Sequence, residues 1–316
     1  MAEFRPFPGL RQKNPDGTGY SEQDPDSFYI LRQETGGGVR TAIIGALKAV
    51  KYSADGISQM DGASPKERSE ASRKTKEAGF QSEPAVCISE PLGEEFLESV
   101  GGEEIPGTGL ERIGDAEQIR KISEMLEGKR LIVTSGAAYY ESAMATKSYV
   151  LAALMPSDGP GFSAEPVHRF VDTGSISEKN AVRGISKSFG LTETTAEDIG
   201  KGLADHLMGL MFRSGACYFA DLPDREAPWS LGSYAAQEKI FKAVYKSDEG
   251  KGTVSYAESM DQAVRAMGEK KHDLAVLLNA PEMDILWETA GSGKRIPKRT
   301  AEFPPEIPSG LVCMKI

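Results

Sequence analysis

The sequence alternates short apolar runs with amphipathic segments, and the alternation is irregular. "ACYFADL" (216–222) and "HDLAVLLNAP" (272–281) are short apolar runs of the kind that predicts strands. "DAEQIRKISEML" (115–126) predicts a helix, because its apolar residues recur on one face and Asp115 can cap its first turn. The pattern predicts an α+β (mixed α/β) fold, in which short-stranded mixed sheets are surrounded by helices.

Further segments fit this interpretation. "SFYILRQ" (27–33) and "VRTAIIGALKAV" (39–50), joined by a Gly loop, predict a β-hairpin. Additional strands are expected within 83–91, 147–156 and 165–172. Additional helices are expected within 177–193, 195–212, 234–246, 256–270 and 283–293.

Four segments are expected to be loop, exposed or extended chain. Residues 1–27 are rich in Pro, Gly, Asp and Asn and are predicted to be mostly loop. Residues 61–79 are polar and charged and predict an exposed helix or a mobile loop, with the loop slightly favoured. Residues 93–111 are acidic and predict a solvated face. Residues 294–316 predict an extended, Pro-rich arm.

The charge and the cysteines restrict the function classes. A net charge of -10 repels nucleic acid and anionic membranes, so neither is an expected partner, whereas local dipoles can still hold a small anionic ligand. The three cysteines are far apart and have no CxxC spacing, which argues against a disulfide framework or a zinc site. With no visible signal peptide and no long apolar run, a cytoplasmic protein is expected.

The stretch "RLIVTSGAAYYESAM" (130–144) has the layout of a strand, a small-residue turn and a helix. Backbone N–H groups at such a turn can bind an anion with help from the helix dipole, and Thr134, Ser135 and Gly136 would form the site. Glu141 can act as a general base or simply interact with the dipole. The turn contains no Lys, Arg or His, so a purely structural corner is favoured over an anion site.

A second candidate is the pair His168 and Arg169 in "PVHRFV". Neighbouring strand residues point to opposite faces, so one of the two is expected to face a cleft. A His and an Arg can hold a phosphoryl group. The alternative, which is favoured, is a His at a strand edge and an Arg paired with acidic neighbours.

Several segments, taken in order, resemble the bacterial and archaeal family known as domain of unknown function 1015. The opening "MAEFRPFPGLR", the hairpin "DSFYILRQE" with "AIIGALKAV", and "EPVHRFV" resemble family segments. The same holds for "LAVLLNAP" and for the tail "RIPKRTAEFPPEIPSGLV", in which the family's Lys-Ser-Thr falls at Lys298 and Thr300. "VTSGAAYYESA" is similar to the family's Asp-Gly-His-His-Arg-Tyr-Glu-Thr-Ala motif.

That motif in turn resembles the nucleotide-binding motif of the chromosome-partitioning B protein and sulfiredoxin superfamily, which includes kinases of free serine. The resemblance implies nucleotide-dependent phosphoryl transfer to a small hydroxyl substrate, with ATP or ADP and Mg²⁺ as cofactor. In an active enzyme with a rebuilt site, Glu141 and His168 would be the catalytic residues. The nucleotide or phosphate would then be bound by Ser135, Arg169, Lys298 and Thr300.

The departures from the motif concern charge. The motif's Asp falls at Ser135, its two His at Ala137 and Ala138, and its Arg at Tyr139. A second family motif, His-Glu-Lys-Thr, falls near residues 60–63 without its His or Lys. Because phosphoryl transfer depends on cations that neutralise the phosphates, losing one such group costs about 10²- to 10³-fold in rate.

The sequence therefore predicts a divergent, catalytically impaired relative of nucleotide-dependent small-molecule kinases that acts as a binding or assembly subunit with a protein partner. An active phosphotransferase using free serine, or a plain binder of a small anionic ligand, stands as the alternative. We expect a nucleotide-site remnant in residues 1–155 and an α/β part in residues 156–316, or one compact unit.

Overall fold

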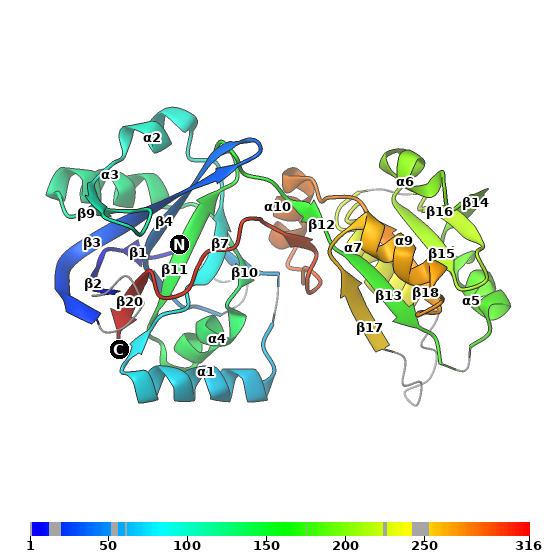
Figure 1. Ribbon diagram of the computed structural model, residues 1–316, viewed down its shortest axis with the longest axis horizontal. Helices are drawn as coiled ribbons and strands as arrows, with labels where there is room; N and C mark the ends of the chain where they lie inside the picture. Colours follow the sequence, from blue (N-terminus) through cyan, green and yellow to red (C-terminus); the bar gives the residue numbers. More distant parts are fainter. Residues whose placement is uncertain are drawn as a thin grey trace. The chain divides into compact units, whose positions relative to one another are not determined.

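The protein, described here as a computed structural model, forms two compact units. Unit 1 comprises Met1–Ser163 and Pro305–Ile316, and unit 2 comprises Ala164–Pro304. Both units combine mixed sheets with surrounding helices, which confirms the predicted mixed α/β class (Figure 1). The predicted division at residue 155 stays a prediction. The structure describes residues 2–12, 20–51, 56–60, 62–174, 176–223, 226–241 and 253–316.

Unit 1 is built on a mixed sheet with the strand order β5-β10-β7-β11-β4-β3-β2-β20-β6, in which β1 also pairs with β4, and β9 pairs with β3 and β8. Its strands are β1 (Phe4–Arg5), β2 (Phe7–Gln12), β3 (Tyr20–Thr35), β4 (Gly38–Lys48), β5 (Ile57–Gln59), β6 (Phe80–Gln81), β7 (Ala85–Ser89), β8 (Glu103–Ile105), β9 (Leu110–Ile113), β10 (Leu131–Ser135), β11 (Tyr149–Pro156) and β20 (Val312–Lys315). The predicted hairpin is confirmed as antiparallel β3 and β4, with Tyr29 opposite Ile44.

The N-terminal segment was predicted to be loop, and this prediction is wrong for the described part, which forms β1, β2 and the start of β3. β2 pairs with β3 and with β20, so that Leu10 lies opposite Cys313. The contact joins residues at the two ends of the chain, which local composition does not reveal. Residues 13–19 of the predicted loop lie outside the described residues.

The helices of unit 1 are α1 (Pro65–Ala78), α2 (Glu94–Ser99), α3 (Ala116–Leu126) and α4 (Ala137–Thr146). α3 confirms the predicted helix, and the Asp115 carboxylate accepts hydrogen bonds from two N–H groups of its first turn. α1 replaces the favoured loop because Ser64 and Glu67 form a capping box and Pro65 occupies the first turn. α1 and α4 lie side by side (Figure 1).

Unit 2 is built on a sheet with the order β14-β16-β15-β18-β13-β17 and a separate pair, β12 with β19. Its strands are β12 (Glu165–Pro166), β13 (His168–Asp172), β14 (Gly190–Thr194), β15 (Met208–Phe212), β16 (Cys217–Asp221), β17 (Thr253–Ala257), β18 (Leu274–Leu278) and β19 (Ala301–Glu302). Its helical segments are α5 (Glu178–Ile185), α6 (Ile199–Gly202), η1 (Leu203–Asp205), α7 (Gly232–Ala235), the π-helical η2 (Ala236–Phe241), α9 (Met260–Gly268) and α10 (Met283–Gly291).

The central strands of unit 2 are buried on both faces. Val171 and Val276 pack with α5 and α7 on one face, whereas Phe170 and Leu277 pack with α6 and α9 on the other. All residues of β15 are buried, although residues 195–212 were predicted to be one helix. This prediction is wrong after residue 205, because a continuous apolar run fits a buried strand as well as a buried helix.

The predicted helix 256–270 is also shorter than expected. Its first residues form the end of β17, and α9 begins after Ser259, whose hydroxyl accepts a hydrogen bond from the Gln262 N–H. No helix in the described ranges has the length and apolar character needed to cross a membrane. In the same ranges, no three His, Cys, Asp or Glu side chains gather as a metal-binding group.

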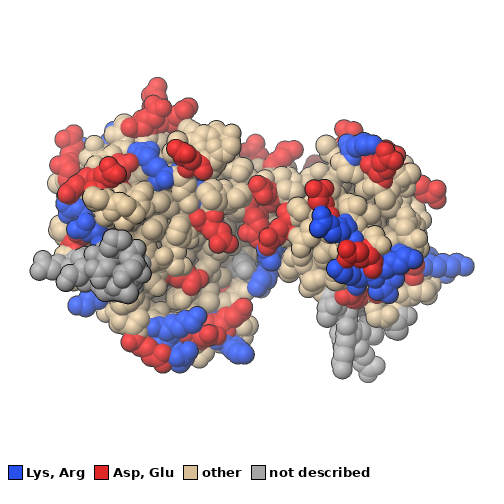
Figure 2. Space-filling view, viewed as in Figure 1, with Lys and Arg blue, Asp and Glu red and all other residues tan. Residues whose placement is uncertain are grey.

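Charged side chains of both signs are interleaved on the surface of unit 1. Figure 2 shows acidic and basic side chains mixed along the edge formed by α1. Two pairs spaced four residues apart on this helix, Arg73 with Glu77 and Lys74 with Glu70, contribute to the pattern. Such exposed pairs add only about 0.3–0.5 kcal/mol each, so α1 depends on its capping and packing.

Candidate functional site

The predicted anion turn is a tight corner between β10 and α4 in unit 1. Gly136 has a φ of 69°, in the left-handed region that favours glycine. A Cβ at this position would lie 2.8 Å from both the Pro84 carbonyl oxygen and the Ala85 Cα. The glycine is therefore required by backbone packing, whether or not the corner binds a ligand.

The side chains around Gly136 do not form a cationic site. The Thr134 hydroxyl donates a hydrogen bond to the Val86 carbonyl oxygen at 3.1 Å, and Ser135 is exposed. Tyr139, which stands where the family motif has Arg, is half-buried, and burial together with Glu83 raises its pKa to about 12. Tyr139 is therefore neutral at pH 7 and supplies no charge to a phosphate.

Glu141, the predicted base, is engaged in structural contacts. It is 8% exposed. One carboxylate oxygen lies 2.7 Å from Arg68 Nη1, and the other accepts a hydrogen bond of 3.1 Å from the Ala63 N–H. This ion pair joins α4 to α1, and it occupies the carboxylate that a general base would use.

The two segments that resemble family motifs meet at this corner. The Met60 N–H donates to the Val133 carbonyl oxygen at 2.8 Å, and Ala63 contacts Glu141 as described. Asp61 lies outside the described residues. Arg68, a cation at this corner, was not among the predicted site residues, because a loop was slightly favoured over a helix for its segment. The Ser64 capping box in the sequence indicates the helix.

In unit 2, His168 and Arg169 are both buried on β13. His168 Nδ1 accepts a hydrogen bond of 3.1 Å from the Leu278 N–H, and burial, with a contribution from Arg169, lowers the pKa of His168 to about 4. Burial lowers the pKa of Arg169 to about 10, and its guanidinium donates to the carbonyl oxygens of Val167 and Lys298. His168 is thus neutral at pH 7, and the hydrogen bonds of the Arg169 guanidinium go to backbone carbonyl oxygens and not to a carboxylate.

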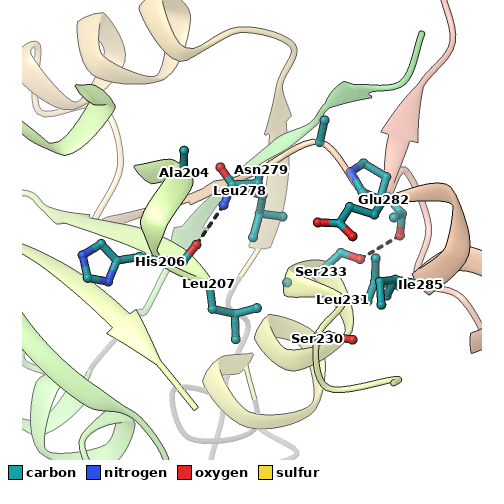
Figure 3. Close-up of a pocket in the computed structure, with 14 residues that line it drawn as sticks. Ala204, His206, Leu207, Ser230, Leu231, Ser233, Leu278, Asn279, Glu282 and Ile285 are labelled. Carbon is teal, nitrogen blue, oxygen red and sulfur yellow. Dashed lines mark hydrogen bonds between the residues drawn. The ribbon is translucent and has the colours of Figure 1, made fainter. Parts of the chain in front are cut away.

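Near these residues, a cavity of about 320 Å³ lies where β18 ends and α10 begins, and we refer to it as the unit 2 cavity (Figure 3). Thr300, one of the predicted residues, lines it and is 2% exposed. Its hydroxyl donates to the Pro297 carbonyl oxygen at 2.7 Å and lies 2.9 Å from the Ser233 hydroxyl. Lys298 is exposed and does not line the cavity.

The described lining of the unit 2 cavity contains one carboxylate, Glu282, and one imidazole, His206, which is hydrogen-bonded to Asp221. Asn279 is fixed by its amide group, which donates to the carbonyl oxygens of Leu203 and His206, and Figure 3 shows the second bond. The His206 ring points away from the cavity in this view, and Glu282 directs its carboxylate into it. No Lys or Arg occurs among the described lining residues.

The structure thus places the predicted residues in two groups. Thr134, Ser135, Gly136 and Glu141 belong to unit 1, and His168, Arg169, Lys298 and Thr300 belong to unit 2. The unit 1 group contains no cation, and in the unit 2 group Arg169 is bonded to backbone carbonyl oxygens while neither Arg169 nor Lys298 lines the unit 2 cavity. At the corner, the one guanidinium identified is paired with Glu141, and the unit 2 cavity carries a carboxylate without a cation.

Comparisons with known proteins identify the family. A family model described as "Protein of unknown function (DUF1015)" matches residues 18–247, which is well over half of the chain and confirms the predicted family. A search of curated proteins gives no match.

Three solved structures show a likeness at low sequence identity. A conserved hypothetical protein from Pyrococcus furiosus is 13% identical over 83% of this chain and 92% of its own, with a TM-score of 0.47. A free serine kinase in complex with AMP is 12% identical over 81% and 89%, with a TM-score of 0.47. SbnI with a C-terminal truncation, from Staphylococcus aureus, is 11% identical over 82% of both chains, with a TM-score of 0.43. Function therefore has to be argued from the residues of this chain.

Proposed function

This chain belongs to the DUF1015 family of proteins of unknown function, and on that basis we propose that it is a catalytically impaired relative of nucleotide-dependent small-molecule kinases that acts as a binding subunit. Its ligand is a small polar molecule held in the unit 2 cavity. The phosphotransferase activity that the family resemblance implies is absent or very weak.

The observation that carries the proposal is the state of the corner at Gly136. The two motif-like segments meet there, and among their described residues the one charged side chain is Glu141, which is paired with Arg68. A general base must reach the proton that it removes, and both oxygens of the Glu141 carboxylate are already engaged, one by Arg68 and the other by the Ala63 N–H. Neutral Ala137, Ala138 and Tyr139 leave the phosphates without compensating charge.

The lining of the unit 2 cavity supports the choice of ligand. The paired hydroxyls of Ser233 and Thr300 offer hydrogen bonds to a polar group, and Glu282 attracts an ammonium group and repels a phosphate. A small amino compound with a hydroxyl group fits this chemistry.

An activity assay tests the first half of the proposal. The protein is incubated with serine, Mg²⁺ and either ATP or ADP, and the released ADP or AMP is measured. We expect no serine-dependent product above the level without protein. Serine-dependent turnover that Glu141→Gln abolishes would overturn the proposal and establish the phosphotransferase.

Restoring the family's charges provides a matched gain-of-function test. The triple variant Ala137→His, Ala138→His and Tyr139→Arg should bind ADP detectably in isothermal titration, whereas the wild type should not. Tight ADP binding by the wild type would contradict the proposal, because it would show that nucleotide binding does not need cations at the corner.

Thermal shift tests the ligand. L-serine should raise the melting temperature, and O-phospho-L-serine should not, because the phosphate meets Glu282 and no cation. The effect of serine should disappear in Thr300→Val. A larger shift with the phosphorylated compound, or no shift with either, would contradict this assignment.

A further inference from the structure

Unit 1 contains a second and larger cavity, of about 650 Å³, which none of the predicted site residues line. α1 and α4, which lie side by side in Figure 1, form one wall through Ser72, Lys76 and Ser142. β1 and β20 contribute Arg5 and Lys315. We call it the unit 1 cavity; its volume is within the range of about 300–1,000 Å³ that is usual for small-molecule sites.

The charge of this cavity is opposite to that of the whole protein. Arg5, Lys76 and Lys315 come from three separate elements, and the lining also holds two carboxylates, the Asp26 side chain and the terminal main-chain group of Ile316. Within the described part of the chain, neither Lys76 nor Lys315 forms an ion pair. In a protein with a net charge of -10, three cations in the lining of one cavity outnumber its carboxylates and favour a negative group locally.

The remainder of the lining is suited to an apolar body with polar edges. Phe7 and Met314 are buried apolar side chains, and the Tyr149 ring carries the Arg5 guanidinium 3.6 Å from its centroid. The hydroxyls of Ser72 and Ser142 make no hydrogen bond in the described part of the chain, so both are available to a ligand.

We propose that the unit 1 cavity binds a small amphipathic organic anion, with a ring-containing apolar body against Tyr149 and Met314 and a phosphate, sulfonate or carboxylate group near Lys76 and Lys315. This site is separate from the unit 2 cavity, and the proposal does not depend on the function proposed above.

A pair of fluorescent probes that differ mainly in charge tests this assignment. 1-Anilinonaphthalene-8-sulfonate has the apolar body and the anionic head, and N-phenyl-1-naphthylamine lacks the sulfonate. Titrated into the native protein, the sulfonate probe should bind more tightly than the neutral probe. Inorganic phosphate alone should compete weakly, because it lacks the apolar body.

Substitutions locate the site. Lys76→Gln combined with Lys315→Gln should weaken binding of the sulfonate probe about tenfold, because both changes remove a positive charge beside its anionic group, and should leave binding of the neutral probe unchanged. The matched control is Arg73→Gln with Lys74→Gln, which removes the same charge from α1 at positions that are already ion-paired and do not line the cavity. The control should bind like the wild type.

Ser142→Trp should fill the cavity and weaken both probes. Circular dichroism and the melting temperature establish that each variant is folded. If Ser142→Trp does not fold, the Lys76 and Lys315 double variant and its control still test the proposal. Equal loss of sulfonate binding in the control pair, or unchanged binding in the Lys76 and Lys315 variant, would overturn the proposal.

Discussion

Two corners of this molecule have the same layout and opposite outcomes. In unit 1, β10 turns at Gly136 into α4, and in unit 2, β18 turns at Asn279–Pro281 into α10. The first corner is filled: the backbone of residues 84–85 lies against Gly136, and Glu141 is paired with Arg68. The second is open, because Asn279 is tied back to carbonyl oxygens and a cavity of about 320 Å³ forms beside it.

The difference shows that a strand, a turn and a helix in sequence do not by themselves make a binding site. What packs against the turn decides whether its polar groups face a ligand or the protein. The sequence of the first corner is more typical of an anion-binding turn, but only the second corner lies beside a cavity that can hold a ligand.

The largest effect should come from the filled corner. Gly136→Ala adds a Cβ against the backbone of Pro84 and Ala85 at a positive φ, so we expect a loss of about 3 kcal/mol or more in the free energy of unfolding. Gly107→Ala is the control, because Gly107 has a φ of 77° with nothing within 4 Å of an added Cβ, and it should lose only about 1 kcal/mol. Equal losses in urea unfolding would show that the corner is not tightly packed.

The next largest effect is the pH dependence of stability caused by His168 on β13, which pairs with β18 in unit 2. His168 has a pKa of about 4 in the folded state, below the ordinary histidine value of about 6.5, so the unfolded state takes up the proton first as pH falls. The contribution of neutral His168 to the free energy of unfolding is complete above pH 6.5 and is lost as the pH falls from 6.5 to 4. From pH 7 to pH 5 the free energy of unfolding should decrease by roughly 2 kcal/mol for this reason.

His168→Asn tests this, because the Asn side chain can accept the Leu278 N–H hydrogen bond and does not titrate. Its stability measured by urea unfolding should vary less between pH 7 and 5 than that of the wild type. Because His206 and His272 are present in both proteins, the difference between the two profiles reports His168. Parallel profiles would contradict the assigned pKa shift.

A smaller effect is expected at the lining of the open corner. Thr300→Val removes the hydrogen bond to Pro297 and leaves the buried Ser233 hydroxyl without this partner, at a cost of about 1–2 kcal/mol. Thr146→Val, at an exposed hydroxyl of α4, should change stability by less than about 0.5 kcal/mol. Thermal unfolding compares the two, and an equal change in both would mean that the Ser233–Thr300 contact adds nothing.

The smallest effect is the coupling inside the filled corner. A double-mutant cycle with Glu141→Gln and Arg68→Gln should give a coupling energy of about 1 kcal/mol, because Glu141 is mostly buried while Arg68 is 41% exposed. The exposed pair Arg73 and Glu77 provides the reference, at about 0.3 kcal/mol. A coupling energy near zero between Glu141 and Arg68 would mean that the ion pair does not hold the carboxylate, which could then act as a base.

Local signals predicted some elements well. The helix capped by Asp115 and the hairpin of β3 and β4 are formed, because capping, periodicity and Gly turns act within a few residues. The capping box at Ser64 was also present in the sequence, and giving it more weight would have predicted α1 and placed Arg68. β15 was predicted as helix because Ile199, Leu203, Leu207 and Leu210 recur at helical spacing, but the last part of this apolar stretch is buried on both faces as a strand.

The candidate sites were less accessible from sequence. Thr300 was identified by resemblance to the family's tail, whereas its partner Ser233 is 67 residues away in the chain and had no motif to mark it. The unit 1 cavity combines Arg5 from the start of the chain with Lys315 from its end, a meeting produced by the pairing of β2 with β20.

The sequence by itself determined the mixed α/β class, the family, the capped helix at Asp115 and the absence of cationic side chains from the turn at Gly136. Only the tertiary structure decided that Glu141 is paired with Arg68, that the corner at Gly136 is filled while the one at Asn279 is open, and that three cations share the unit 1 cavity. The physical reason is range: capping and periodicity act within a few residues, whereas ion pairs and cavities are formed by side chains that only the folded chain brings together.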